Sequence, residues 1–170
     1  AEYEKEVQAN ILAPLYFVKL VTPIMIQQNS GIIINIGSEA SRWDGIGVTL
    51  GYAMSKAGLG RQTSILAKEL REYNITVVNI EPGGTDVGRP ISSADAGWRV
   101  STDAPAATVT HIVTHPYPMT FSGKTIDAPI FAAEHALVDS YALGSTGPYG
   151  PAAWGLPPRA PRPLNTNPGS

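Results

Sequence analysis

Two runs of apolar, mostly β-branched residues constrain the fold of this chain more than any other feature. They lie at 32–36 (IIINI) and 75–80 (ITVVNI), and neither alternates between apolar and polar positions. Continuous runs of this length are typical of strands that are buried on both faces of a parallel sheet. The stretch between them predicts a helix over 51–72, and strand, helix and strand in this order form a βαβ unit with a right-handed crossover. The sequence therefore predicts an α/β fold.

Other segments predict a long helix before this unit and shorter elements after it. Residues 4–28 carry apolar side chains three or four positions apart, which is the spacing of an amphipathic helix. Pro14 and Pro23 interrupt the pattern, and each predicts a kink or an early end because proline lacks the backbone N–H. The later elements that we expect are a helix at 104–114, a strand at 123–127 and a helical segment at 130–138.

The C-terminal segment differs in composition from the rest of the chain. Residues 145–170 hold seven of the 15 prolines and few large aliphatic side chains. Such a segment cannot bury enough surface to offset its ordering entropy. We therefore assign 1–144 to one folded domain and 145–170 to an extended or disordered tail. The alternative is a Pro-rich recognition segment.

Composition narrows the class of protein. The net charge of −2 across 170 residues gives no nucleic-acid or anionic-membrane signature. The absence of cysteine rules out disulfides and thiolate metal sites. No apolar run reaches the ~18 residues of a membrane span, and the first residues lack the apolar core of a signal peptide. We expect a cytoplasmic protein with no membrane, nucleic-acid or metal partner.

Tyr52 and Lys56, in GYAMSKAG, are the candidate catalytic pair. Four positions apart on a predicted helix, they lie on one face, one turn apart. A single such pair is weak evidence by itself, because chance placement produces it in some chains. Its context adds weight, since Ser38 follows the first apolar run and Pro82 the second. Open α/β sheets bind ligands beyond the carboxyl ends of their strands, so these residues are expected to converge at one edge.

At this point the sequence resembles the short-chain dehydrogenases/reductases. The resemblance rests on Asn10 in QANILAP, Ser38 in NIGS, Tyr52 and Lys56 in YAMSK, and Pro82-Gly83 in EPGG. It covers 1–88 well and 103–138 more loosely. It implies a partial Rossmann-like, doubly wound parallel sheet, made of the three C-terminal strands with flanking helices. Helices 4–28 and 52–71 would cover one face and 104–114 the other.

The resemblance also implies an NAD(P)-dependent interconversion of an alcohol and a ketone. Tyr52 would exchange a proton with the substrate oxygen, and Ser38 would hydrogen-bond that oxygen. Lys56 would bind the nicotinamide ribose and favour the tyrosinate, while Asn10 would hold a water molecule in a proton relay. The hydride chemistry would belong to the cofactor.

The nicotinamide end of the cofactor would lie beside Pro82 and Gly83. Thr85 would contact its amide, although Thr85 is closer to Gly83 here than in the family pattern. Trp43, Trp98 and Arg99 could line a substrate pocket or belong to the surface. His111 and His115 are expected at the surface, because no cluster of partner residues accompanies them.

The chain departs from the family in lacking a Gly-rich G-x-x-x-G-x-G turn. That turn would cradle the pyrophosphate at a helix N-terminus. We therefore expect the C-terminal portion of a longer protein, or a truncated product, that alone binds dinucleotide poorly or not at all. The cofactor would be NAD or NADP. The edge of strand 32–36 would be exposed and could pair with another segment or chain.

Three hypotheses follow from the sequence. The first is an oxidoreductase that associates as a homo-oligomer through helices 4–28 and 52–71 and acts on a small alcohol or carbonyl compound. The second is a non-catalytic fragment or remnant that acts only through subunit association. The third, an extended sugar-nucleotide epimerase, shares the Tyr-Lys pair but is disfavoured because little chain remains for a nucleotide-sugar domain.

Overall fold

A computed structural model describes residues 2–42, 48–85, 88 and 100–139 of this chain. The chain divides into two compact units. The first comprises Ala1–Pro82 and Val109–Asp127, and the second comprises Gly83–Thr108 and Ala128–Ser170. The predicted tail at 145–170 lies outside the described residues.

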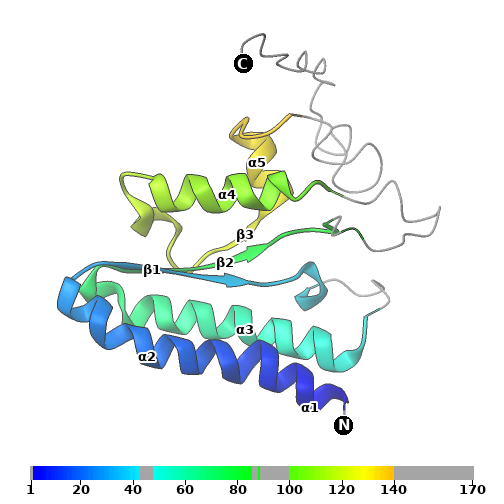
Figure 1. Cartoon of the computed structure of the whole chain (residues 1–170), viewed down its shortest axis with the longest axis horizontal. Helices are drawn as coiled ribbons and strands as arrows, with labels where there is room; N and C mark the ends of the chain where they lie inside the picture. Colours follow the sequence, from blue (N-terminus) through cyan, green and yellow to red (C-terminus); the bar gives the residue numbers. More distant parts are fainter. Residues whose placement is uncertain (1, 43–47, 86–87, 89–99, 140–170) are drawn as a thin grey trace, which may run out of the picture. The chain divides into compact units, whose positions relative to one another are not determined.

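A parallel sheet organises the first unit. It contains β1 (Gly31–Ile36), β2 (Ile75–Glu81) and β3 (Thr125–Asp127) in the order β1-β2-β3 (Figure 1). β2 is buried along its whole length because it lies between two strands, whereas β1 is only partly buried. The predicted βαβ unit is confirmed, and the third strand is shorter than the predicted 123–127.

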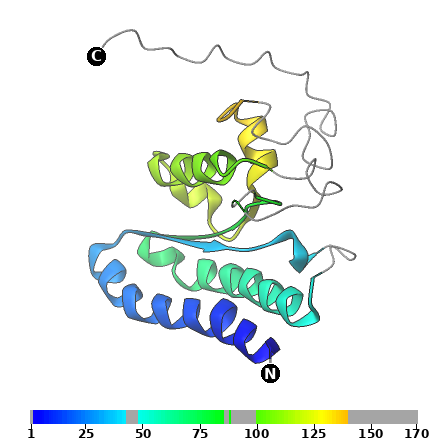
Figure 2. The same cartoon turned by 45° about the vertical axis from the view of Figure 1, so that its right-hand side comes forward.

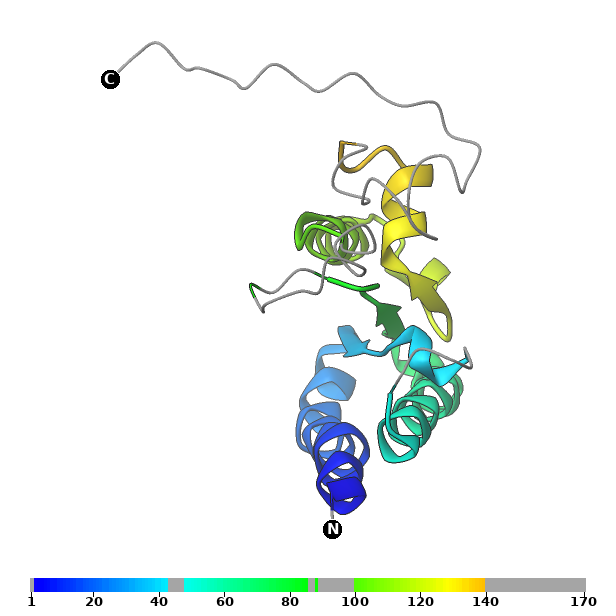
Figure 3. The ribbon, with the colours of Figure 1, turned by 90° about the vertical axis from the view of Figure 1, so that its right-hand side faces the viewer.

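Two long helical segments cover one face of this sheet. The first runs through α1 (Glu2–Val7), the π-helical segment η1 (Gln8–Leu12) and α2 (Ala13–Gln28). The second is α3 (Leu50–Glu69), which connects β1 to β2 after the 3-10 turn η2 (Glu39–Ser41) and is followed by the 3-10 turn η3 (Arg71–Tyr73). Figures 1 and 2 show α2 and α3 side by side on this face, as predicted, and Figure 3 views the same pair nearly end-on.

The two prolines of the first helical segment occupy different positions in α2, and neither ends the helix. Pro14 stands in the first turn of α2, where a missing N–H is tolerated, and the switch from π- to α-helix comes just before it. Pro23 lies inside α2 without ending it, so an early end at this residue does not occur. The helix ends instead at Gln28 and is capped by Asn29, whose left-handed backbone (φ 49°) is common just after a helix end.

α3 packs on the sheet through a stripe of mostly small side chains. Every fourth residue is buried: Ser55, Leu59, Thr63 and Ala67. The Thr63 hydroxyl accepts a hydrogen bond from Asn35 Nδ2 (2.8 Å) and donates one to the Leu59 carbonyl (3.0 Å). Short side chains let the helix approach the strands closely, and the paired hydroxyl removes the cost of burying a polar group.

The other face of the sheet is covered by the end of α4 (Asp103–Thr114) and the 3-10 turn η5 (Pro118–Phe121). The residues of α4 from Val109 onward belong to the first unit and lie opposite α2 and α3 in Figure 1, as predicted for that part of 104–114. Ile112 and Phe121 are the buried residues of this layer.

The second unit holds the start of α4 and α5 (Ala128–Glu134). Ala104 and Ala132 form its small apolar core, and the Thr108 hydroxyl donates a hydrogen bond to the Ala128 carbonyl (3.2 Å). The predicted helical segment at 130–138 therefore starts two residues earlier and ends at Glu134.

The first helical segment exposes an unusually apolar surface. Tyr16, Phe17, Leu20 and Ile24 are each more than half exposed. By length and composition alone, Tyr3–Gln28 is apolar enough to cross a membrane, although Lys19 interrupts its longest apolar run. Its contacts with α3 and β1 favour a helix that packs against protein.

Candidate active site

Ser38 lies just beyond the carboxyl end of β1. Its backbone is extended, and its Oγ accepts a hydrogen bond from the Ala40 N–H (3.2 Å), so Ser38 caps the η2 turn. A serine hydroxyl that accepts one bond still has a hydrogen to donate. The local fold therefore holds this hydroxyl at the sheet edge where a ligand is expected.

Tyr52 and Lys56 lie in the first two turns of α3. The helix is capped by Thr49, whose Oγ1 accepts from the Tyr52 N–H (3.2 Å) and donates to Glu6 Oε1 (2.8 Å). Lys56 Nζ is 5.7 Å from the centre of the Tyr52 ring. The predicted placement of these two side chains on one helix face is confirmed.

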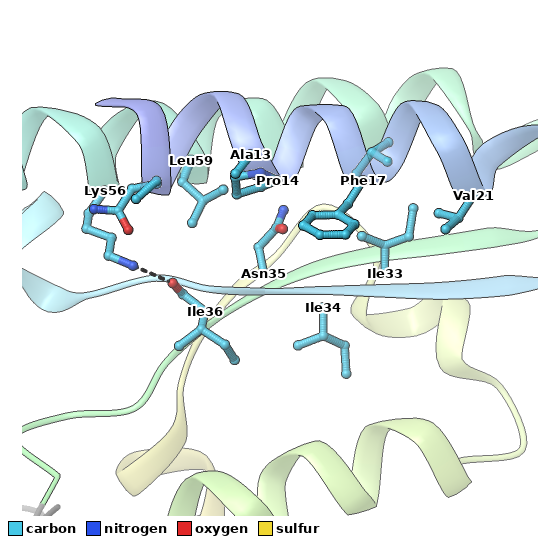
Figure 4. A pocket seen from close by; sticks show the side chains of 13 residues that line it. Ala13, Pro14, Phe17, Val21, Ile33, Ile34, Asn35, Ile36, Lys56 and Leu59 are labelled. Atoms are coloured by element: carbon cyan, nitrogen blue, oxygen red, sulfur yellow. Dashed lines mark hydrogen bonds between the residues drawn. The ribbon is translucent and has the colours of Figure 1, made fainter. Parts of the chain in front are cut away.

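The Lys56 ammonium is also bound to the edge strand. It donates to the Ile36 carbonyl at 2.8 Å (Figure 4). The Gly37 N–H donates to the Ile80 carbonyl of β2, and because a trans peptide points its two polar groups in opposite directions, the Ile36 carbonyl faces away from β2. Partial burial lowers the pKa of Lys56, since desolvation disfavours the charged form.

Asn10 reaches α3 through a residue that sequence reasoning missed. It lies in the π-helical segment η1, and its Nδ2 donates to the Ser55 hydroxyl (3.0 Å). Ser55 is fully buried and donates in turn to the Tyr52 carbonyl (2.8 Å). Asn10 is thus tied to the turn that carries Tyr52, and short π-helical segments are frequent at functional sites. The signal in the sequence was the spacing of four residues between Ser55 and Leu59, which places both on one face of a helix.

A second missed residue is Glu81, which ends β2 directly before Pro82. Its side chain is fully buried and ion-paired with Arg42. The signal in the sequence was a charged residue that closes the apolar run ITVVNIE. Among the residues that the structure describes, no group of three or more His, Cys, Asp or Glu side chains is arranged to hold a metal ion.

Glu39 adds a titratable group beside Ser38. Burial and, to a smaller extent, the negative charges of Asp127 and Glu81 together raise its pKa from 4.5 to about 7, against the opposing effect of Arg42. Its Oε2 atom is buried and has no hydrogen-bond partner among the residues that the structure describes, which agrees with a carboxyl group that is poorly solvated.

The remaining predicted residues are divided between the two units. Pro82 ends a segment of the first unit, whereas Gly83 and Thr85 belong to the second. Gly83 has φ +76°, a conformation that favours glycine, and its carbonyl accepts from the Thr85 N–H (2.8 Å). Trp43, Trp98 and Arg99 lie outside the described residues.

A pocket of about 400 Å³ opens along β1 on the side away from β2 (Figure 4). α2 contributes Phe17 and Val21, β1 contributes Ile33, and the lining is largely apolar. Asn10 and Lys56 add polar groups near the end of β1 where Ser38 follows. In the described part of the chain β1 pairs only with β2, so this pocket follows its open edge.

The sequence of this chain is similar to those of known proteins. A family model described as short chain dehydrogenase matches residues 1–95. The short chain dehydrogenase adrF of Penicillium rubens is 34% identical over 110 residues, covering 65% of this chain and 42% of that protein. The NADP-dependent 3-hydroxy acid dehydrogenase of Schizosaccharomyces pombe is 32% identical over 77 residues, covering 45% of this chain and 29% of that protein. This chain therefore spans less than half the length of these relatives.

Solved structures agree on the fold. A 3-oxoacyl-[acyl-carrier protein] reductase with bound NAD from Brucella melitensis aligns with a TM-score of 0.66 and 25% identity, over 74% of this chain and 50% of that one. An NADPH-bound carbonyl reductase from chicken fatty liver aligns with a TM-score of 0.61 over 74% of this chain and 54% of that one; at 23% identity, this match supports the fold alone.

Proposed function

This chain belongs to the short-chain dehydrogenase family, and we propose that it carries the proton-transfer site of an NAD(P)-dependent interconversion of an alcohol and a ketone. The observation that carries the proposal is the approach of Lys56 Nζ to the Tyr52 ring, at 5.7 Å, on the helix that follows Ser38. A tyrosine hydroxyl with a nearby ammonium is suited to general acid–base catalysis.

Each side chain has a defined part in the proposed reaction. In the reducing direction, the Tyr52 hydroxyl gives its proton to the carbonyl oxygen, and the Ser38 hydroxyl donates a hydrogen bond to the same oxygen. The positive charge of Lys56 stabilises the tyrosinate that remains. Asn10 acts more remotely, because its amide is bonded to Ser55 and so steadies the turn that carries Tyr52.

The residues present fit the nicotinamide end of a dinucleotide. Lys56 uses one of its three N–H donors on the Ile36 carbonyl, so two can bind ribose hydroxyls. When bound, the nicotinamide supplies the hydride. The sequence has no Gly-rich turn for the pyrophosphate.

The test is to titrate NADH and NADPH into the purified 170-residue chain and follow nicotinamide fluorescence. Saturable binding of either supports the proposal. Turnover would then be assayed with a panel of ketones that includes 3-oxo acids, the class suggested by the Schizosaccharomyces pombe relative. Tyr52→Phe is expected to abolish turnover and retain binding, and Tyr117→Phe, at a tyrosine that is 71% exposed, is the matched control. Full turnover by Tyr52→Phe would reject the assigned role.

The apolar surface of α2 favours a second candidate, a non-catalytic fragment that functions by subunit association. Side chains such as Phe17 (68% exposed) and Leu20 (69% exposed) are available for a helix–helix interface. We propose homo-oligomers through residues 4–28 and 52–71 under either candidate. Sedimentation velocity checks this, since Leu20→Glu is expected to shift the chain to monomer. A chain that associates without binding either nucleotide would favour the second candidate.

A further inference from the structure

A buried carboxylate at the end of β2 is bound by the turn that follows Ser38. Glu81 is fully buried, and an isolated charge in such a place is strongly disfavoured. Both of its oxygens are engaged. Ser41 Oγ donates to Oε1 (3.0 Å), while Arg42 donates to Oε2 through Nε (3.1 Å) and through Nη2. Two consecutive residues of one turn therefore hydrogen-bond the Glu81 carboxylate, and Arg42 supplies the opposite charge.

That turn is built on Ser38. The Ala40 N–H bonds to Ser38 Oγ, and the Ser41 N–H bonds to the Ser38 carbonyl (3.0 Å). Moving Ser41 away from Glu81 would pull on the hydrogen bonds that define the position of Ser38. The contact between Ser41 and Glu81 thus connects the carboxyl ends of β1 and β2 and affects the orientation of the Ser38 hydroxyl.

We propose that Glu81 is a positioning residue that holds the Ser38 hydroxyl in place through Ser41 and Arg42, without touching the substrate. This inference rests on the proposed function for its use in catalysis. A buried ion pair contributes little net stability compared with apolar residues of the same size, so stability alone does not account for this pair. Two donors of the planar Arg42 guanidinium reach Oε2 while Ser41 bonds Oε1, and three charge-assisted hydrogen bonds to one carboxylate restrict its orientation.

Other carboxyl groups around Arg42 favour a persistent ion pair between Arg42 and Glu81. Arg42 Nη2 also lies 3.9 Å from Asp127 Oδ2 of β3, and Glu39 adds a third carboxyl group nearby. The hydrogen bond to Glu81 raises the pKa of Arg42, and these other carboxylates raise it further, so the guanidinium stays charged throughout the physiological range.

Amide hydrogen exchange tests the positioning without any need for activity. In Glu81→Gln and in Arg42→Lys, the amides of Ala40, Ser41 and residue 42 are expected to exchange about tenfold faster, while the Asn79 amide, bonded to the Lys124 carbonyl in the core, changes much less. Arg42 is half exposed, so its lysine variant is expected to fold even if Glu81→Gln does not. Exchange in the turn that is unchanged, or that rises only in proportion to Asn79, would overturn the inference.

Turnover of the whole chain tests the use of this positioning. Arg42→Lys is expected to lower kcat/KM for the ketone about tenfold while leaving the Kd for NADPH unchanged, and to have no further effect in a Ser38→Ala background. Arg61→Lys, on the outer surface of α3, is the control. Additive losses in the double variant would show that Arg42 does not act through Ser38. If the unaltered chain turns over no ketone, the proposed function fails, and the exchange experiment still decides whether Glu81 positions Ser38.

Discussion

Replacing Glu39 by glutamine is expected to stabilise the chain at alkaline pH and to have little effect in acid. The folded chain holds the Glu39 proton up to a pKa of about 7, whereas an ordinary glutamate loses it at 4.5. Between these values the folded state binds more protons than the unfolded state, so the free energy of unfolding falls as pH rises. Glutamine carries no charge at any pH and avoids this loss.

The magnitude follows from the size of the shift. A difference of about 2.5 pKa units corresponds to about 3 kcal/mol if it is fully expressed. Glu39 is only half-buried, and solvent screening reduces the expected effect to about 1 kcal/mol. The loss of stability caused by ionised Glu39 is absent below pH 4.5 and complete above about pH 7, so the free energy of unfolding changes between these two pH values.

Urea denaturation at a series of pH values measures the effect as a difference between the two proteins. At about pH 8 the Glu39→Gln variant is expected to unfold with a free energy about 1 kcal/mol higher than the unaltered chain, and at about pH 4 the two are expected to coincide. Glu72→Gln, which removes an exposed carboxyl group from η3, is the control for loss of a charge. Parallel pH profiles for Glu39→Gln and the unaltered chain would refute the reasoning.

Two further predictions concern packing around the site. Gly37→Ala is expected to lower the free energy of unfolding by about 1–3 kcal/mol in urea, because its Cβ would lie 2.6 Å from the buried amide of Asn79. Gly60→Ala, whose nearest neighbour would be 3.9 Å away, is expected to raise it by ~0.5–1 kcal/mol, and effects of the same sign would contradict this distinction. Ser55→Ala is expected to cost about 1–3 kcal/mol in the same assay, since it leaves the Asn10 amide without its partner. An unchanged unfolding midpoint would show that this hydrogen bond contributes nothing.

The candidate site was predictable where local chemistry decides the structure. Tyr52 and Lys56 share a face because the helical period brings residues four apart together, whatever the helix packs against. Ser38 and Pro82 lie at one edge because parallel strands end on the same side of a sheet. The supporting residues Ser55 and Glu81 were not predictable in this way, since their partners are 39 to 45 residues distant along the chain.

The sequence by itself determined the strands, their parallel βαβ connection and the order of the Tyr-Lys helix between them. Apolar runs, helical spacing and turn residues act over a few positions and need no tertiary partner. Only the tertiary structure decided which side of α3 faces the sheet. The apolar Ile65 is 42% exposed, while Ser55 and Thr63 are buried with their hydroxyls hydrogen-bonded, because close helix–strand packing favours short side chains. Tertiary structure likewise buried Glu81, since only a folded chain can bring Arg42 within reach of its charge.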